Sequence, residues 1–154
     1  NSGRNIKMLN GEMHIGIPNV IQITVEIMGA YAYFCPETVS MFVSEYVTDY
    51  CNPSVDFYEF EKGHGYFFPS SQRKFNVLNP REETVYTVDA DEFGIAITLY
   101  TYDCIIHADT SELSPDNLAK SKSDLVKIKQ LRDYLYNYAM QNFNSGNLKY
   151  ITQG

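Results

Sequence analysis

A pair of aromatic segments joined by a glycine-containing turn constrains the fold more than any other feature of this chain. Residues 55–61 read VDFYEFE, residues 62–65 read KGHG and residues 66–68 read YFF. Aromatic and β-branched residues favour the pleated surface of a strand, and two glycines within four residues favour a tight reversal. The sequence therefore predicts a β-hairpin, and with it an antiparallel sheet.

Further strands are expected on both sides of this hairpin. Lys74–Leu78 and Thr84–Val88 have strand composition and are separated by residues 79–83, which read NPREE and favour a turn. Together with the hairpin they predict an antiparallel meander of about four strands. Ahead of it, isoleucine or valine occupies every second position from Ile21 to Ile27, which is the period of a half-buried strand.

Three segments have the apolar period and the start signals of helices. Pro36 suits a first helical position, Asp89 with Glu92 three residues later has the pattern of a capping box, and Ser114-Pro115 is a second start signal. The helices are expected over residues 36–50, 89–107 and 115–143. The predicted class is therefore α+β, an antiparallel sheet of about four strands packed by three main helices.

Gly94 lies inside the second of these predicted helices. A glycine in a helix costs about 1 kcal/mol relative to alanine. We expect this helix to pack closely against the sheet at Gly94.

The length of 154 residues is that of one ordinary domain. We expect residues 1–17 to be a flexible leader, residues 18–146 a single α+β domain and residues 147–154 a tail. No apolar run is long enough to cross a bilayer and no signal-peptide layout is present, so the sequence predicts a soluble, cytoplasmic protein. The three cysteines form no CxxC pair, and we expect reduced, mostly buried thiols at Cys35, Cys51 and Cys104.

The charge is acidic and unevenly distributed. The net charge is −7, with fourteen acidic and four basic residues between Glu37 and Glu112, and three acidic and six basic residues over residues 113–154. Binding along a nucleic-acid backbone requires a basic face, so direct nucleic-acid binding is disfavoured. The acidic excess is also modest for a protein that imitates DNA, and a solvated acidic surface is the more ordinary explanation.

Catalytic and metal-binding patterns are missing from the sequence. There is no phosphate-binding glycine loop, and the residues 62–65 are better explained as a turn between strands. His14, His64 and His107 are far apart and form no metal-binding pair, and the hairpin acids lack the lysine partner of a nuclease motif. We therefore expect a non-enzymatic protein with no cofactor and no metal site.

The hairpin and the segments around it resemble one protein family. Residues 56–69, DFYEFEKGHGYFFP, resemble the "F-Y-x-L-x-N-G-G-F-Y-x-x-P" hairpin of the ArdB/KlcA antirestriction proteins. Residues 88–99, VDADEFGIAITL, are similar to the family's "S-A-D-A-A-G-I-V-A-T-L" segment, and residues 131–139 are similar to its terminal "L-R-D-F-A" helix. The chain is identified as a divergent member, since it has no tryptophan and has Lys62 and His64 where the family often has Asn and Gly.

The resemblance implies an antirestriction protein of a mobile genetic element. Such a protein relieves the activity of type I restriction endonucleases by non-enzymatic protein interaction, without imitating DNA. The implied partner is the type I restriction–modification complex or an associated host protein, with no direct contact to nucleic acid or membrane. The resemblance supplies no catalytic residues.

The candidate partner-contact residues are polar or aromatic positions on the hairpin and acidic positions beyond it. They are Tyr58, Glu59, His64, Tyr66, Glu82, Glu83, Asp91 and Glu92. Aromatic residues on a strand also serve as core, so a purely structural role for the hairpin aromatics stays open at this point. The alternative function is a small-molecule or peptide-binding accessory module of a mobile element, with the aromatic hairpin lining its pocket.

Overall fold

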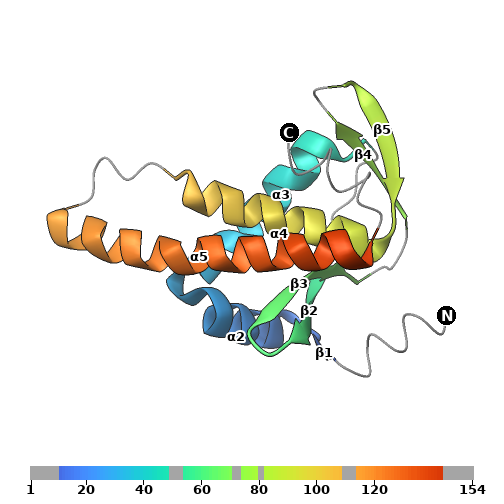
Figure 1. Ribbon diagram of the computed structural model, residues 1–154. Helices are drawn as coiled ribbons and strands as arrows, with labels where there is room; N and C mark the ends of the chain where they lie inside the picture. The colour runs from blue at the N-terminus through green and yellow to red at the C-terminus, as the bar shows by residue number, and fades with distance from the viewer. Residues whose placement is uncertain (1–10, 49–53, 71–73, 80–81, 109–113, 144–154) are drawn as a thin grey trace.

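The computed structural model describes residues 11–48, 54–70, 74–79, 82–108 and 114–143 (Figure 1). Within them the elements follow one another as β1 (Glu12–His14), α2 (Ile17–Met28), the 3-10 helix η1 (Gly29–Phe34), α3 (Cys35–Tyr46), β2 (Val55–Glu61), β3 (His64–Pro69), β4 (Phe75–Asn79), β5 (Thr84–Val88), α4 (Ala90–Ile106) and α5 (Pro115–Asn142). All strand pairs are antiparallel. The predicted α+β class is confirmed.

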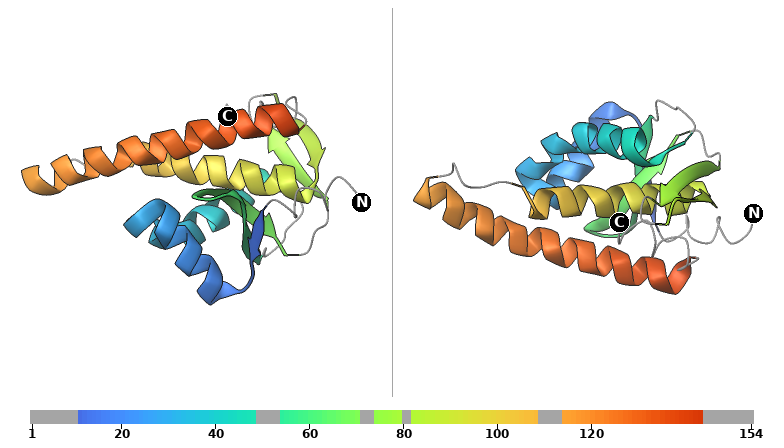
Figure 2. Two further views of the ribbon diagram at one scale, coloured as in Figure 1. Left: turned by 60° about the horizontal axis from the view of Figure 1, so that its bottom comes forward. Right: turned by 90° about the horizontal axis from the view of Figure 1, so that it is seen from above.

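Helix α4 is the centre of the molecule. Figure 2 shows it between α5 on one side and the strands β1–β3 with α2 and α3 on the other. Thirteen of its 17 residues are buried, so it is apolar nearly all round, as expected of a helix enclosed by neighbours. The predicted capping box is present: the Asp89 carboxylate accepts from the Glu92 backbone N–H, and the Glu92 carboxylate accepts from that of Asp89.

The contact between α4 and β3 explains the glycine inside the helix. A Cβ atom on Gly94 would clash with the backbone carbonyl oxygen of Phe67. One turn later, the Thr98 hydroxyl accepts a hydrogen bond from the Phe67 N–H (2.9 Å) and donates one to the Gly94 carbonyl (2.7 Å). The close packing expected at Gly94 is confirmed, and the helix covers a strand edge that would otherwise present unpaired backbone groups.

The strands form two sheets rather than the single four-stranded meander that we expected. One sheet has the order β1-β2-β3 and the other consists of β4 and β5. The physical reason is that α4, not β4, occupies the free edge of β3. The second sheet attaches elsewhere: the Phe75 ring of β4 stacks on Phe93 of α4 with centroids 3.8 Å apart, and Val77 bridges to Val47.

The strand predicted over Ile21–Ile27 is wrong, because this segment belongs to helix α2. An alternating run also contains residues four apart, and Ile23 and Ile27 are such a pair on the buried face, while Ile21 is exposed. Pro18 lies in the first turn, where its fixed φ suits a helix start. Packing of one helical face therefore overrides the strand preference of the β-branched residues.

Other boundaries shift by a few residues. Within residues 1–17, Glu12–His14 form β1 and pair with β2. Helix α3 ends at Tyr46 because Val47 adopts an extended conformation and bridges to Val77. The last predicted position of that helix, Tyr50, and the expected tail over residues 147–154 lie outside the described residues.

Candidate functional site

Two of the candidate contact residues on the hairpin belong to the core. Tyr58 and Tyr66 face each other across β2 and β3 with ring centroids 5.5 Å apart, and both are buried. The Tyr66 hydroxyl donates a hydrogen bond to the Asp91 carboxylate at 2.8 Å. Burial, and then the neighbouring Asp91 charge, raise the pKa of Tyr66 well above its usual value. Tyr66 connects the hairpin to α4, and the burial of both tyrosines makes them unavailable to a partner in this conformation.

Two of the acidic candidates are buried as well. Asp91 binds Tyr66, and Glu92 completes the capping box of α4; each side chain lies in the first turn of that helix. A carboxylate at this end of a helix is stabilised by the unpaired N–H groups and the positive end of the helix dipole. Their burial removes Asp91 and Glu92 from the candidate contact set.

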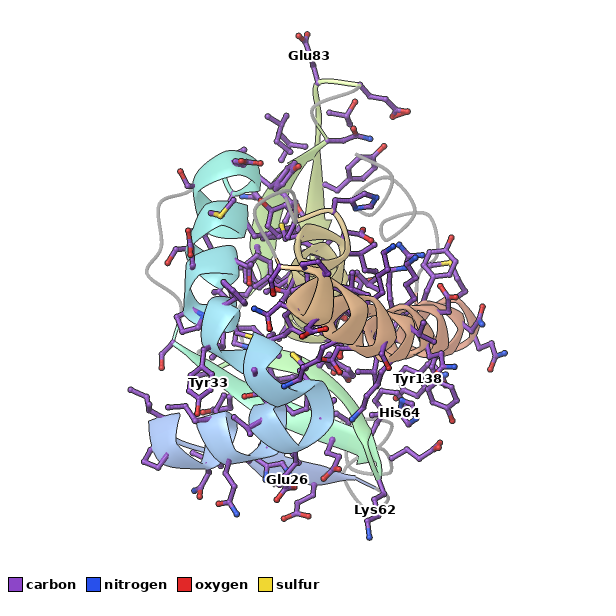
Figure 3. All side chains as sticks on the ribbon, turned by 90° about the vertical axis from the view of Figure 1, so that its left-hand side faces the viewer. Glu26, Tyr33, Lys62, His64, Glu83 and Tyr138 are labelled. Carbon is purple, nitrogen blue, oxygen red and sulfur yellow. The ribbon has the colours of Figure 1, made fainter. Side chains whose placement is uncertain are left out.

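The remaining four candidates occupy two separate places. Glu82 and Glu83 lie at the exposed turn between β4 and β5, where Tyr86 donates a hydrogen bond to Glu82 (3.2 Å). Glu59 and His64 lie on the β2–β3 hairpin and are half-buried. Figure 3 places Glu83 at one end of the molecule and His64 with Lys62 at the other. The structure therefore does not bring the eight predicted residues into one patch.

The tip of the β2–β3 hairpin is instead combined with α5. We call Glu61, Lys62, His64 and Tyr134 the hairpin-tip surface. The Tyr134 hydroxyl donates to both Glu61 carboxylate oxygens (2.7 Å each), and its ring stacks on His64 with centroids 3.9 Å apart. That hydrogen bond, chiefly, raises the pKa of Tyr134.

Aromatic rings of β2 and α5 pack next to the hairpin-tip surface. Phe60 of β2 stacks on Tyr138 of α5 with centroids 3.8 Å apart, and Tyr134 lies one helical turn before Tyr138. Sequence reasoning missed both tyrosines as site residues. Their i, i+4 spacing on a helix was the available signal, but nothing local in the sequence shows that this helical face meets the hairpin tip.

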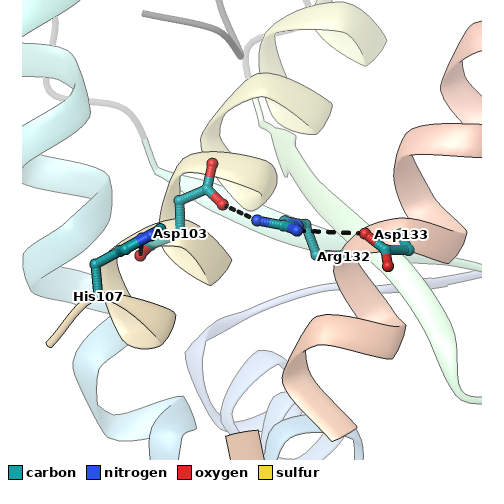
Figure 4. Close-up of polar contacts among 4 residues, drawn as sticks. All are labelled: Asp103, His107, Arg132 and Asp133. Atoms are coloured by element: carbon teal, nitrogen blue, oxygen red, sulfur yellow. Dashed lines mark hydrogen bonds and ion pairs between the residues drawn. The ribbon is translucent and has the colours of Figure 1, made fainter. Parts of the chain in front are cut away.

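The contact between α4 and α5 is further fixed by an ion pair (Figure 4). The Arg132 guanidinium donates to the Asp103 carboxylate at 2.7 Å, and its other terminal nitrogen lies 3.4 Å from Asp133. The hydrogen bond to Asp103 is the main reason why the pKa of Arg132 is raised. The His107 ring nitrogen Nδ1 pairs with the Asp103 backbone carbonyl at 2.9 Å, so His107 closes the end of α4.

The described cysteines show no sign of an activated thiol. Cys35 is buried and burial raises its pKa to about 12, so it stays protonated near neutral pH. Burial also raises the pKa of the half-buried Cys104. Cys51 lies outside the described residues. Neither described cysteine therefore has the low pKa of a nucleophile.

Two further features bear on binding. A cavity of about 560 Å³ lies between η1, α3, the end of α4 and the start of α5; its wall includes Tyr31, Phe34, Met41 and Ile105.

Separately, Glu12, His14 and Glu59 form a group with metal-ligating atoms within 4.8 Å of one another. Among the described helices, none is both long enough and apolar enough to cross a membrane.

Residues 48–148, which include both hairpins, α4 and α5, match the family model of antirestriction proteins. The chain belongs to the antirestriction protein family, and the resemblance to the ArdB/KlcA proteins is confirmed.

One solved structure extends the likeness to nearly the whole chain. It is that of the KlcA and ArdB proteins, described as a novel fold with antirestriction activity against type I DNA restriction systems in vivo but not in vitro. The similarity has a TM-score of 0.67 at 14% identity and covers 92% of this chain and 94% of that one. No curated protein sequence matches significantly. At this identity the structural likeness shows a shared fold.

Proposed function

We propose that this protein relieves type I restriction in the cytoplasm of a host cell, as an accessory protein of a mobile genetic element. The observation that carries the proposal is membership of the antirestriction family over residues 48–148, together with a fold shared with KlcA and ArdB. The protein acts through non-enzymatic contact with the type I restriction–modification complex or an associated host protein.

The hairpin-tip surface is the proposed contact site. It combines exposed charge at Glu61 and Lys62 with the half-exposed ring of Tyr134. Tyrosine is enriched among residues that dominate binding energy, because it buries a large rigid area and retains a polar group. Stacking on His64 and the hydrogen bonds to Glu61 hold the ring before a partner arrives, which reduces the entropy lost on binding. The exposed Glu82–Glu83 turn is a second candidate contact.

The first experiment measures plating of unmodified phage on cells with a type I restriction system, with and without this protein. The test belongs in cells because KlcA and ArdB are active in vivo but not in vitro. We expect plating to rise toward that of a restriction-deficient strain while DNA modification continues. Unchanged plating across several type I systems, despite soluble expression, would show that family membership here conveys the fold without the activity.

A pair of surface variants then separates the two candidate contacts. Lys62→Glu with His64→Ala changes the hairpin-tip surface, and Glu82→Lys with Glu83→Lys reverses the charge at the opposite turn. Both pairs avoid Asp91 and Glu92, whose replacement would damage the helix cap. We expect the first pair to lose relief of restriction while the protein stays folded, as circular dichroism would show. Retained activity would remove the hairpin tip from the proposal, and loss in the second pair alone would place the contact at the acidic turn.

The cavity favours a second candidate function, binding of a small molecule or peptide. Its volume of about 560 Å³ lies within the usual range for ligand pockets, and its wall is largely apolar. It is not at the aromatic hairpin, whose rings are in the core. Screening by ligand-observed NMR with small aromatic compounds tests this function. Binding that is abolished by Met41→Trp, which fills the cavity, would support it.

A further inference from the structure

Three metal-ligating side chains meet on one face of the sheet, beside the hairpin tip. Glu12 and His14 are two residues apart on β1, so they project from the same face. Glu59 of β2 is the direct partner of Glu12 in the register. A carboxylate oxygen from each glutamate and a ring nitrogen from the histidine all lie within 4.8 Å of one another.

The pairing of Glu12 with Glu59 is electrostatically unfavourable by itself. Like charges directly opposite each other on neighbouring strands destabilise a sheet. Among the residues that the structure describes, His14 is the only side chain that forms an ion pair with either glutamate, and imidazole carries a charge only when protonated. A cation bound between the two carboxylates would remove this repulsion.

Glu59 is held in place by a backbone group outside the cluster and by His14 within it. Its Oε2 atom accepts a hydrogen bond from the Gly63 backbone N–H at 2.9 Å, and its Oε1 atom lies 3.1 Å from His14 Nε2. The strand register shifts between Glu59 and Glu61, and irregularities of this kind re-aim side chains. The Glu59 and His14 side chains are only 14% and 18% exposed, so both are shielded from water. A hydrogen bond to the second oxygen of a carboxylate is the usual way in which a protein orients a metal ligand.

We propose that Glu12, His14 and Glu59 bind a zinc ion. Zinc takes imidazole nitrogen and carboxylate oxygen at about 2.0–2.2 Å, which puts neighbouring ligand atoms of a tetrahedral site about 3.3 Å apart. The 3.1 Å between His14 Nε2 and Glu59 Oε1 is close to that spacing. Glu12 is exposed, so its side chain can complete the site without disturbing the core. Calcium and magnesium prefer oxygen ligands alone, so the histidine favours zinc.

Zinc at this position would fasten β1 to β2. Strand β1 has only three residues and lies at the edge of its sheet. Three ligands from two strands would link it to the hairpin and neutralise the facing carboxylates. This inference does not depend on the antirestriction activity, because its test measures metal binding.

The test is calorimetric titration of the full chain with zinc chloride after removal of metal by a chelator. We expect one zinc ion per chain and a higher melting temperature with zinc, since a ligand that binds the folded state stabilises it. His14→Asn and Glu59→Gln should each weaken zinc binding by about tenfold or more. Loss of a group that only hydrogen-bonds to a metal ligand already lowers metal affinity by about tenfold, and these two residues are ligands themselves. Glu12→Gln changes an exposed side chain and keeps the test valid if the other variants fold poorly.

His107→Asn is the matched control. It removes an imidazole that lies at the end of α4 and bonds to the Asp103 carbonyl, so zinc affinity should stay at the original value. Absence of measurable zinc binding by the original chain would overturn the proposal. Equal zinc affinity in the original chain and in the folded Glu12→Gln and His14→Asn variants would also overturn it, since the ligands would then be other groups such as the thiols.

Discussion

Strands β3 and β5 both contain many strand-forming residues, but their environments are opposite. Each is the second strand of a hairpin, and each combines aromatic or β-branched residues with few charges: β3 reads HGYFFP and β5 reads TVYTV. All but the first residue of β3 are buried, whereas only the last residue of β5 is. The difference therefore does not come from strand propensity.

The neighbours of the two strands account for the difference. Helix α4 lies on the edge of β3, where Gly94 allows close approach and Thr98 bonds to the Phe67 N–H. In the second sheet the burial lies on β4, whose Phe75 stacks on Phe93, while Val85 of β5 is 50% exposed. A strand with a hydrophobic sequence becomes core only where another element covers it. The following changes test how far this contrast extends.

Gly94→Ala should have the largest effect. The added Cβ would meet backbone atoms of Phe67, which cannot move without separating α4 from β3. We expect a loss of about 4 kcal/mol or more in the free energy of unfolding, or no folded protein. Gly63→Ala is the control, because its φ of 84° strains alanine but no atom lies near the new Cβ, and we expect it to cost about 1–2 kcal/mol. Similar costs measured by urea unfolding would contradict the close contact.

Truncation of one side chain on each strand gives the next largest contrast. Phe67→Ala removes a buried ring that packs edge-on against Phe57 at 5.4 Å, and it should cost about 3–5 kcal/mol. Val85→Ala on the exposed strand should change stability by less than about 0.5 kcal/mol. Urea unfolding followed by circular dichroism measures both. A substantial loss at Val85 would show that β5 is covered in solution, for example by a partner copy.

Removal of one hydroxyl from each strand gives a smaller difference. Tyr66→Phe removes the hydrogen bond that the hydroxyl donates to the buried Asp91 carboxylate and should cost about 1.5–3 kcal/mol, as expected for a bond to a charged group. Tyr86→Phe removes an exposed bond to Glu82 and should cost less than about 0.5 kcal/mol. Thermal unfolding of the two variants under the same conditions checks the pair. Equal shifts would mean that burial does not strengthen the Tyr66 contact.

The same contact should affect how stability depends on pH above neutrality. Ionisation of Tyr66 has no effect on stability at neutral pH. Burial and Asp91 raise the pKa of Tyr66 in the folded state above the value of about 10 expected when the chain is unfolded. The folded state then holds this proton more tightly, so the resulting stability is present below about pH 10 and is lost as the pH rises toward the folded value. Burial likewise raises the pKa of Tyr138 to about 12.

Urea unfolding at a series of alkaline pH values measures this effect. We expect the free energy of unfolding of the original chain to fall above about pH 10. Tyr66→Phe removes one of the responsible groups, so its stability should fall less steeply. An identical slope in both proteins would show that Tyr66 does not contribute to the alkaline limb.

Local signals in the sequence predicted much of the fold correctly. Strands β2 and β5 have the expected bounds, the capping box at Asp89 opens α4, and Ser114 caps α5. These features depend on residues within one turn or one strand of each other. The wrong prediction at α2 shows the limit of such signals, because the alternating run from Ile21 to Ile27 also contains residues four apart, and only tertiary packing decides between a strand face and a helical face.

The candidate site was less predictable than the elements. Of the hairpin candidates, Tyr58 and Tyr66 are core, while His64 lies on the surface next to Tyr134, a residue seventy positions further along the chain. Alternation distinguishes the two faces of a strand but does not tell which face a distant helix will cover. The group formed by Glu12, His14 and Glu59 could not be predicted from the sequence either. It exists only because β1 pairs with β2, two strands that are far apart in the chain.

The sequence by itself determined where the hairpins, the helix caps and the closely packed glycine lie, and which family the chain resembles. The tertiary structure decided that the strands divide into two sheets, that β3 is buried while β5 is exposed, and that the hairpin tip joins α5. The physical reason is the range of the interactions. Caps, turns and periodicity act between near neighbours in the chain, whereas burial depends on which distant surfaces meet.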